Sequence, residues 1–428
     1  MFRALRGHNY RRWASADLVS STGTWMQVLG LNWLVLQATG SATAVGMTIL
    51  AQTVPMLLLG TWSGALADRL PSRPLVLATQ SMHVVLAGAL TLIALTGAPI
   101  TAIYLVAGLT GLVAAFDGPP MGRLAAQVIG REDLGNALAL GSVVNSTGRI
   151  LGMSLGGVLA GLAGEFVLFA VNGLSFLAVI GAILALRTSA LHPMAVSPPQ
   201  RAGVLAGFRY LRGESRLLVL FALGFVLSSV GRNYQVTMAA MSTGPLQTGA
   251  AGFGLLSTVF AAGTVVGGLL AAQWRELTIR VLLGAAAVTS VLQMLSGFSS
   301  GLLLFATVLL PIAAGAVVID TAMGTRVQLD SSEEMRGRVL AAQSSVAAAA
   351  GALGAPLVGW LSETLGPALA LHLAGLVSIV ATAAAASVLA RGRRATRPAP
   401  EPLLRRLDPV RLIPHSNPRT TLQPDPVV

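Results

Sequence analysis

The sequence contains no cysteine and no lysine, and these absences exclude several classes of function. All 28 of its basic residues are arginine, against 16 acidic residues, which gives a formal net charge of +12. Without cysteine the chain has no disulfide, no thiolate metal site and no thiol nucleophile. Without lysine it lacks the ammonium group of a Walker A site, a Schiff base or a protein kinase.

Charged residues are also scarce. They make up 10% of the 428 residues, whereas soluble domains carry about 25%, and the mean hydropathy is +0.74. The chain therefore has too little polar surface to cover itself in water. In a soluble protein, a net charge of +12 would suggest binding to nucleic acid. Here the arginines do not cluster on one polar domain, so no nucleic-acid partner is expected.

Twelve long apolar stretches account for most of the chain. A bilayer core about 30 Å thick requires roughly 20 apolar residues per helix. The expected spans are 14–37, 42–66, 74–97, 99–120, 135–161, 165–187, 216–241, 249–272, 278–298, 300–324, 337–361 and 366–390. The sequence therefore predicts an all-α membrane protein with twelve transmembrane helices.

The spans predict five segments. Residues 1–13 form an N-terminal segment, 14–187 a first six-helix half, and 188–215 a linker with an amphipathic surface helix. Residues 216–390 form the second half, and 391–428 an Arg- and Pro-rich tail expected to lack its own fold. The first span is expected to stay uncleaved, because its apolar run is too long for a signal peptide and ends without a small-residue cleavage site.

The arginines predict the orientation. Twenty-six of the 28 fall at the termini or in the loops on their side, and the opposite loops hold none. By the positive-inside rule both termini are expected in the cytoplasm, with the chain crossing the cell membrane. The two remaining arginines, Arg149 and Arg232, fall inside spans.

An internal repeat divides the chain in two. The pattern of residues 20–28 recurs at 228–236, and Asp117 in span 4 corresponds to Asp320 in span 10. Several such matches occur in order at a slowly drifting offset of 202 to 209 residues. Two parallel halves of this kind are the architecture of major facilitator transporters.

Two motifs resemble signatures of that superfamily. The loop after span 2 is similar to G-x-L-x-D-R-x-G-R-R, with matches at Gly64, Leu66, Asp68, Arg69 and Arg73 and departures at Pro71 and Ser72. Span 5 is similar to the antiporter motif G-x-x-x-G-P-x-x-G-G, with matches at Gly148, Gly152, Gly156 and Gly157 and with Met153 in place of proline. The resemblance covers roughly residues 9–390.

Shorter motifs resemble the twelve-span drug:proton antiporter branch that includes the enterobactin exporter and macrolide efflux proteins. They are Asn9-Tyr10-Arg11, Thr39-Gly40-Ser41 and Arg336-Gly337-Arg338-Val339. The resemblance implies a gate in which Asp68 meets the N-terminus of span 11 beside Arg336 or Arg338 when the cytoplasmic side closes. Arg69 and Arg73 would lock the same face, although Asp68 read alone is a solvated loop carboxylate.

The span 5 glycines recur every four residues, which lets another helix approach closely. We expect a contact with span 8, which carries Gly263-x-x-x-Gly267. The same spacing is also satisfied by structural packing alone.

Polar stripes on spans 1 and 7 predict a water-filled cavity, because such stripes are costly against lipid. The candidate cavity residues are Ser20, Thr24, Trp25, Gln27, Asn145, Arg149, Arg232, Tyr234 and Gln235. For each arginine the alternative is a structural ion pair, such as Arg149 with Asp17 or Asp117. Asp17 is the candidate for proton coupling, while His83 and His372 fit packed helix positions better. No metal site and no cofactor is expected.

These features predict a secondary transporter, not an enzyme. It would export an amphipathic small molecule, such as a drug, antibiotic or siderophore-like metabolite, by alternating access and proton antiport. Two intramembrane arginines against one deep carboxylate favour an anionic or neutral substrate. Its expected partners are substrate, protons and membrane lipids, and it is expected to be a monomer. The alternatives are an importer or uniporter on the same fold, and a membrane sensor or scaffold that transports nothing.

Overall fold

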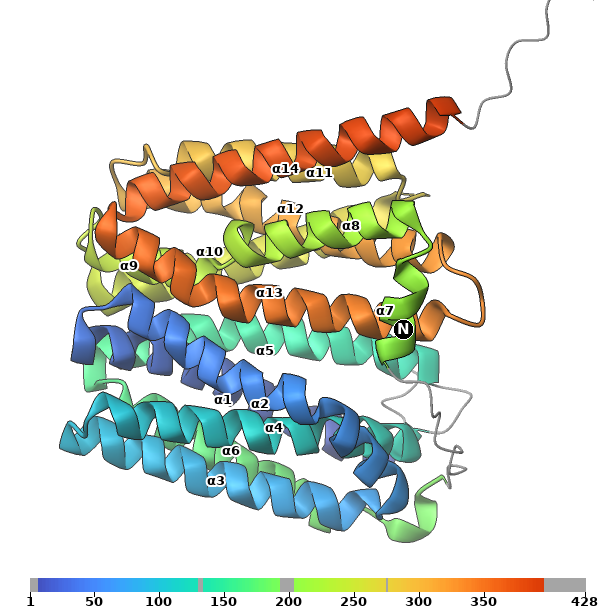
Figure 1. The fold of residues 1–428 in the computed structure, drawn as a ribbon. Coiled ribbons are helices and arrows are strands. Elements are labelled where there is room, and N and C mark those ends of the chain that lie inside the picture. Colours follow the sequence, from blue (N-terminus) through green and yellow to red (C-terminus); the bar gives the residue numbers. More distant parts are fainter. Residues whose placement is uncertain (1–6, 130–133, 193–203, 275, 396–428) are drawn as a thin grey trace, which may run out of the picture.

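The computed structural model describes residues 7–129, 134–192, 204–274 and 276–395 (Figure 1). Within these ranges the chain is helical and contains no strand. The first six long helices are α1 (His8–Thr39), α2 (Ala42–Arg69), α3 (Ser72–Thr96), α4 (Ile100–Ile129), α5 (Leu134–Ala163) and α6 (Phe166–Leu184). The later helices are α7 (Val204–Leu211), α8 (Ser215–Val226), α9 (Tyr234–Thr243), α10 (Gly249–Gln273), α11 (Ile279–Ser296), α12 (Leu302–Leu329), α13 (Arg336–Thr364) and α14 (Pro367–Ala395).

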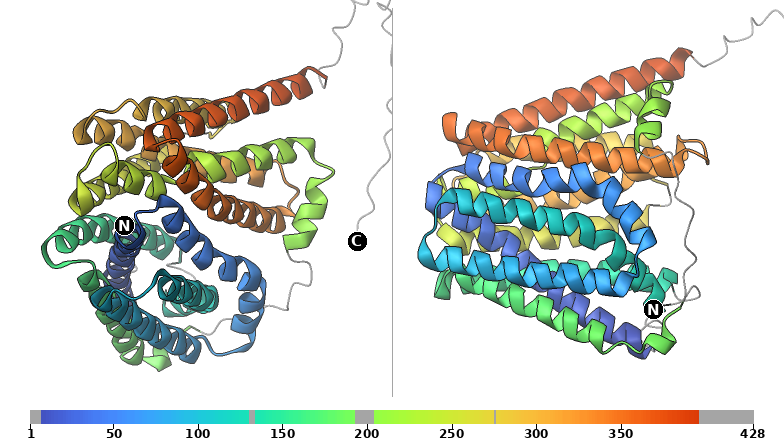
Figure 2. Two further views of the ribbon diagram at one scale, coloured as in Figure 1. Left: turned by 60° about the vertical axis from the view of Figure 1, so that its left-hand side comes forward. Right: turned by 60° about the horizontal axis from the view of Figure 1, so that its bottom comes forward.

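The helices form two groups side by side, α1 to α6 and α8 to α14 (Figures 1 and 2). Within the first group, α1 packs on α5 and α6, and α2 packs on α4; within the second, α10 and α11 pack on α12, and α11 packs on α14. The groups meet where α2 packs on α13 and α5 packs on α10. These four helices therefore form the interface between the two halves.

We call the end of the bundle at which α1 begins the inner end and the opposite end the outer end. Asn9 fixes the inner end of α1, because its amide donates to the Arg187 carbonyl at 3.0 Å and its oxygen accepts from the Arg187 amide at 3.1 Å. At the outer end, α1 stops at Gly40, whose φ of 65° is a left-handed conformation that glycine adopts without strain. Ser41 then caps α2 by accepting from the Ala44 amide at 2.9 Å.

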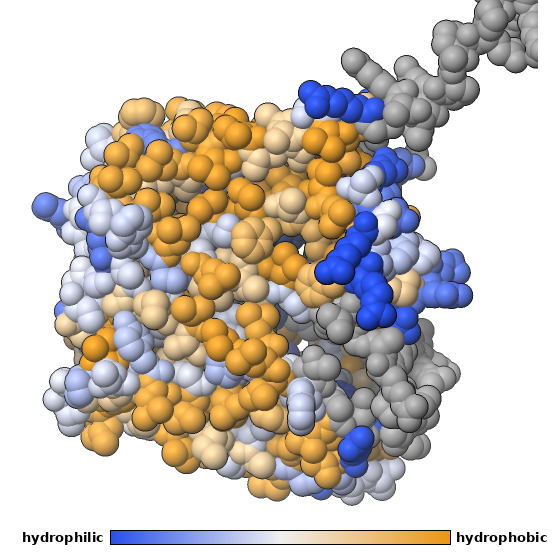
Figure 3. Space-filling view, viewed as in Figure 1, coloured by the Kyte–Doolittle hydropathy of each residue, from blue (hydrophilic) through white to orange (hydrophobic). Residues whose placement is uncertain are grey.

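Ten of the described helices, with residues 215–243 taken together, are long and apolar enough to cross a membrane. The long helices α1 and α5 complete the expected twelve but are not among these ten. Helix α1 carries several polar residues that pack inside the protein, among them Gln27 and Asn32. In Figure 3 apolar side chains cover most of the visible surface, and strongly polar ones gather toward the inner end. This distribution matches a bundle surrounded by lipid along its length.

Span 7 differs from the expected continuous helix. α8 ends in a π-helical turn, Leu227–Gly231, and α9 begins only at Tyr234. The break frees backbone carbonyls, and the Asn233 side chain satisfies two of them by donating to Ser228 at 3.4 Å and Ser229 at 2.5 Å. The polar stripe predicted on one face of this span is therefore interrupted between Arg232 and Gln235.

The linker between the halves contains α7, which packs on α13 instead of standing alone on the membrane surface. A Cβ at Gly207 would lie 2.5 Å from the Arg338 carbonyl oxygen, so only glycine permits this approach. Leu211, the last residue of α7, is buried, and Phe208 is exposed. Helix α14 extends to Ala395, beyond the expected end of span 12, and residues 396–428 of the expected tail lie outside the described residues.

Candidate functional site

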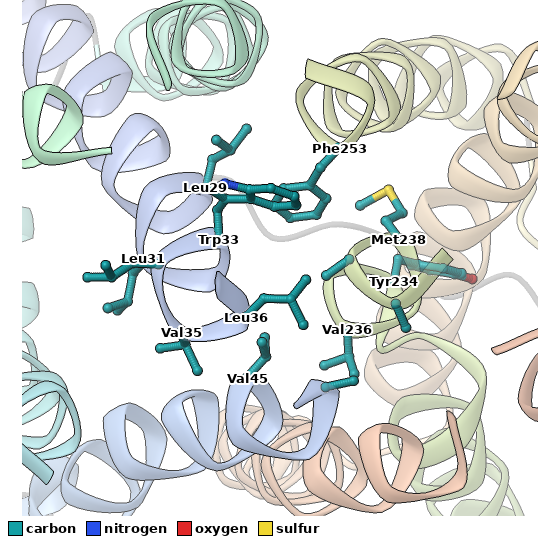
Figure 4. Close-up of a cluster of buried hydrophobic side chains, with 14 of the residues drawn as sticks. Leu29, Leu31, Trp33, Val35, Leu36, Val45, Tyr234, Val236, Met238 and Phe253 are labelled. Carbon is teal, nitrogen blue, oxygen red and sulfur yellow. The ribbon is translucent and has the colours of Figure 1, made fainter. Parts of the chain in front are cut away.

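The two halves are in close contact at the outer end. A Cβ on Gly157 of α5 would lie 2.7 Å from the Cα of Gly254 on α10, so these backbones touch. On the other side of the bundle, a Cβ on Gly46 of α2 would lie 2.4 Å from the backbone of Ala355 on α13. Figure 4 shows apolar side chains of α1, α2, α9 and α10 converging in this region. The outer end is therefore closed.

Polar and aromatic contacts also cross the halves at the outer end. The Glu363 carboxylate of α13 accepts from the Ser41 hydroxyl at 2.6 Å and from the Thr43 amide and hydroxyl, both at 2.8 Å. The Trp33 ring stacks on Phe253 with centroids 6.1 Å apart (Figure 4). We call the Glu363 contacts the outer latch.

Two faces of the inner half of α2 are uncovered. Leu58 and Trp62 are 71% and 75% exposed, and Gly60 has open space at its Cβ position. Leu58 and Trp62 are four residues apart and share one face of α2, while Gly60 lies on the opposite face. Ser63, on a third side of the helix, is buried. The exposure of the other two faces fits halves that separate toward the inner end.

A cavity of about 310 Å³ lies between the halves. Its charged lining residues are Arg149, Arg232 and Asp320, which gives the cavity wall a net charge of +1. Its other lining residues are Ser228, Asn233, Tyr234, Phe260, Thr264, Ala316, Val317, Ala347 and Gly351. The combination of two cations, hydroxyl groups and aromatic rings suits an amphipathic ligand.

Arg149 lies on α5, and its guanidinium reaches the second half. It donates to the Thr264 hydroxyl of α10 and lies 5.2 Å from the ring centroid of Trp25 and 5.8 Å from that of Phe260. Among the described residues it forms no ion pair with a carboxylate. The ion pairs considered for it, with Asp17 or Asp117, do not form in this structure.

Arg232 lies at the break in span 7 and has a carboxylate partner. It donates to Asp320 on α12 and to the Ser228 hydroxyl, the latter at 2.8 Å. The Arg232 side chain is 18% exposed, and that of Asp320 is 63% exposed. Arg232 is therefore part of an ion pair in the cavity wall, with its carboxylate the more accessible partner.

Tyr234 also lines this cavity, and its hydroxyl is buried. The residue is 6% exposed, and its hydroxyl has no hydrogen-bond partner among the described residues. Its ring lies against Phe260 with centroids 4.8 Å apart. A buried hydroxyl without a partner is destabilising unless a ligand or water binds it.

The structure places several other predicted cavity residues elsewhere. Gln27 accepts from Asn172 of α6 at 2.8 Å, inside the first half, and Ser20 is buried on the same side. Gln235 follows the break in span 7 and accepts from Asn32 at 2.5 Å. Thr24 and Asn145 are exposed, but neither lines the described cavity. The stripe on span 1 therefore serves packing within the first half more than the cavity.

The span 5 glycines contact a different helix from the one expected. Gly148 and Gly152 lie against Ser21 and Thr22 of α1, and Gly156 approaches Met26. The contact between α5 and α10 exists, but Gly157 and Gly254 make it. Gly263 and Gly267 of α10 pack instead on α12, against Leu310 and Ala314.

Asp17 lies away from the cavity, in a small apolar pocket between α1, α4 and α6 lined by Trp13, Met121, Val179 and Ile183 among others. No hydrogen bond or ion pair to its carboxylate is found among the described residues. An unpaired carboxylate in apolar surroundings can avoid the cost of its charge by binding a proton.

Three arginines of the expected gate have contacts other than Asp68 in this structure. Arg73 donates to the Leu184 carbonyl at 3.2 Å, and Arg336 donates to the Gln328 carbonyl at 3.1 Å. Arg338 contacts Met335, and Arg69 is exposed. The side chain of Asp68 lies outside the described residues, and Gly64 has open space around its Cβ position. An open inner end is the state in which this gate would be released.

Sequence reasoning missed Thr264, Phe260 and the pairing of Asp320 with Arg232. The signal for Asp320 was present, because the repeat aligns it with Asp117 and the Arg232 stripe faces the same cavity. Thr264 and Phe260 gave no local signal, since neither residue type is unusual in a membrane helix. Among the described residues no cluster of His, Asp and Glu side chains could hold a metal ion.

Two six-helix halves around a polar cavity that is closed at one end and open at the other define a secondary transporter. The chain belongs to the transmembrane secretion effector family of the major facilitator superfamily, whose family model matches residues 1–405. The predicted twelve-helix fold, membrane transport and efflux branch are confirmed, and the family is one of transporters, not enzymes.

Relatives agree with this assignment. The chain is 26% identical over 380 residues to the multidrug efflux pump Tap of Mycolicibacterium fortuitum, covering 82% of this chain and 88% of Tap. It is 23% identical over 264 residues to the staphyloferrin A transporter of Staphylococcus aureus, covering 60% of this chain and 65% of that transporter. The crystal structure of the nucleoside transporter NupG matches with a TM-score of 0.72 at 12% identity, over 89% of this chain and 99% of NupG. This last match shows the fold alone.

Proposed function

We propose that this transporter exports an amphipathic small molecule that carries an anionic group. One observation carries the proposal: Arg149, a cation without a carboxylate partner among the described residues, lies in the cavity wall between two aromatic rings. A buried guanidinium is costly unless an anion compensates it. A substrate carboxylate would supply that charge, and its apolar part would lie against Trp25 and Phe260.

The direction we propose is outward transport from the cytoplasm. The arginines at the inner end support placing that end in the cytoplasm and the protein in the cell membrane. The cavity would then load from the cytoplasm in the present state and release outside after the outer contacts open. Tap, a relative, is named a multidrug efflux pump, which supports the same direction.

Proton antiport is the energy source we propose, with Asp17 as the proton-binding group. Its apolar pocket and lack of a partner among the described residues support this role. Moving a proton inward and an anion outward transfers two charges across the membrane. Each charge is worth about 2.3 kcal/mol per 100 mV of membrane potential, so about 4.6 kcal/mol would be available per cycle at a potential of about 100 mV. We propose that a monomer surrounded by lipid is the working unit and that no nucleic acid takes part.

We also propose that the inner gate implied by the family resemblance operates in this protein. Asp68, with Arg69 and Arg73, would approach Arg336 and Arg338 at the start of α13 when the inner end closes. The outer latch would hold in the present state and the inner gate in the other.

The test compares three naphthalene compounds in everted membrane vesicles, where export is measured as uptake. 2-Naphthoate is a monoanion, 2-naphthalenemethanol is neutral and 2-naphthylmethylamine is a cation. Arg149→Ala should reduce 2-naphthoate uptake about tenfold to a hundredfold, because a hydrogen bond to a charged group contributes about 1.5–3 kcal/mol. Uptake of the neutral compound should change far less.

Arg280→Ala provides a matched control, because Arg280 is exposed at the inner end of α11, outside the cavity. It removes one arginine from the same protein and should leave 2-naphthoate uptake unchanged. Equal loss of uptake for all three compounds in Arg149→Ala, with normal expression, would assign Arg149 to structure and refute the proposed anion site. Uptake driven into right-side-out vesicles instead would favour an importer.

A further inference from the structure

The ion pair in the cavity wall is arranged with its carboxylate outward. Asp320 is 63% exposed, whereas Arg232 behind it is 18% exposed. Arg232 is held from the other side by the Ser228 hydroxyl at 2.8 Å. A ligand in the cavity therefore reaches Asp320 more readily than the guanidinium that Asp320 neutralises.

The first half shows that an aspartate at this repeat position can be held without an arginine at the position of Arg232. Asp117 corresponds to Asp320, and Thr24 corresponds to Arg232 at an offset of 208. Asp117 accepts from Thr79 at 2.5 Å and from Gln80 at 3.1 Å, both on the neighbouring helix α3. In the first half, neutral side chains therefore donate the hydrogen bonds that the aspartate accepts. The second half has placed an arginine at this position instead, and the resulting ion pair faces the cavity that Arg149 also lines.

We propose that Asp320 masks Arg232 as a second anion-binding subsite, and so makes Asp320 a specificity-determining residue that limits the transporter to substrates with one anionic group. The inference rests on the proposed function, in which Arg149 binds the first anionic group. A second anionic group must displace Asp320 from Arg232 and remain beside a negative charge, which Coulomb repulsion opposes.

Removing the charge of Asp320 tests the mask by a gain of binding. Asp320→Asn keeps the size of the side chain, frees Arg232 and raises the net charge of the cavity wall from +1 to +2. The probes are 2-naphthoate and 2,6-naphthalenedicarboxylate, which share one ring system and differ by one carboxylate. Their binding to purified protein is measured by equilibrium dialysis. Asp320→Asn should increase affinity for the dicarboxylate about tenfold or more relative to the monocarboxylate, as expected for one added charge-assisted contact.

Two variants control the measurement. Asp330→Asn makes the same change at the inner end of α12, where Asp330 pairs with Arg326 at 2.7 Å outside the cavity. It should not alter the preference. Arg232→Gln/Asp320→Asn removes both charges and should lose the gain, while 2-naphthoate still binds through Arg149. If Asp320→Asn alone does not fold, the double variant still tests the mask. It should bind the dicarboxylate no better than wild type does, and tighter binding would refute the mask.

The outcomes separate the two proposals. If wild-type protein binds 2-naphthoate and Arg149→Ala weakens it, but Asp320→Asn gains nothing for the dicarboxylate, the mask is refuted and the anion site stands. An equal gain in Asp330→Asn, or a double variant that keeps the gain, also refutes the mask. Absence of 2-naphthoate binding to wild-type protein refutes the anion site itself.

Discussion

The outer latch predicts how a single carboxylate biases the two states of the transporter. Glu363 receives three hydrogen bonds from Ser41 and Thr43 across the halves. Glu363→Gln keeps an acceptor oxygen but removes the charge. Hydrogen bonds to charged groups contribute about 1.5–3 kcal/mol, and neutral ones about 0.5–1.5 kcal/mol. Because Glu363 is exposed, solvent screening reduces the difference to about 0.5 kcal/mol per bond, or about 1.5 kcal/mol for three. The outward-open population should therefore rise about tenfold relative to the inward-open one.

Electron paramagnetic resonance distance measurements can check this shift directly. The chain has no native cysteine, so spin labels attach only at introduced sites. Thr96→Cys and Ser300→Cys place one label at the outer end of each half, at exposed positions. Glu363→Gln should increase the longer-distance fraction, and Glu363→Ala should increase it further.

Glu165→Gln serves as the matched control, because Glu165 also lies at the outer end but contacts Gln37 within its own half. It should leave the distance distribution unchanged. A wild-type distribution in both Glu363 variants, or an equal shift in Glu165→Gln, would refute the reasoning that Glu363 holds the halves together.

Two further predictions concern the outer contact and the proton. Gly254→Val should prevent the outer end from closing, since even a Cβ would lie 2.4 Å from the Cα of Gly157. The same spin labels should then report an open outer end. The control Gly268→Val lies on the same helix with open space at its Cβ position and should behave as wild type. Asp17→Asn should abolish the stimulation of 2-naphthoate uptake by a pH gradient while leaving exchange of labelled for unlabelled 2-naphthoate intact; gradient-driven uptake at the wild-type rate would exclude Asp17 from coupling.

The transmembrane architecture could be predicted from sequence because the bilayer imposes it directly. Each crossing needs about 20 apolar residues, and the arginines record the side on which each loop lies. The repeat added the two halves. These signals need no knowledge of which helix lies beside which.

The faces of the helices could not be predicted in the same way. The spacing of polar residues on span 1 suits a cavity, but Gln27 satisfies its polar group equally well against Asn172 of the neighbouring helix. Glycine spacing likewise indicates a close approach without naming the partner, which is why Gly263 was assigned to α5 and packs on α12. The break in span 7 contains no proline, and it depends on Asn233 satisfying carbonyls that an uninterrupted helix would use.

The glycine contacts at the outer end also affect whether ions can leak across the membrane through the protein. Where Gly157 meets Gly254 and Gly46 meets Ala355, the joint is made of backbone, with no side chain that can reorient by itself. Such a joint separates only when whole helices move. While the cavity is filled from the inner end, water and ions have no partly open route through it. The protein can therefore remain in a membrane at full potential without dissipating the ion gradients across that membrane.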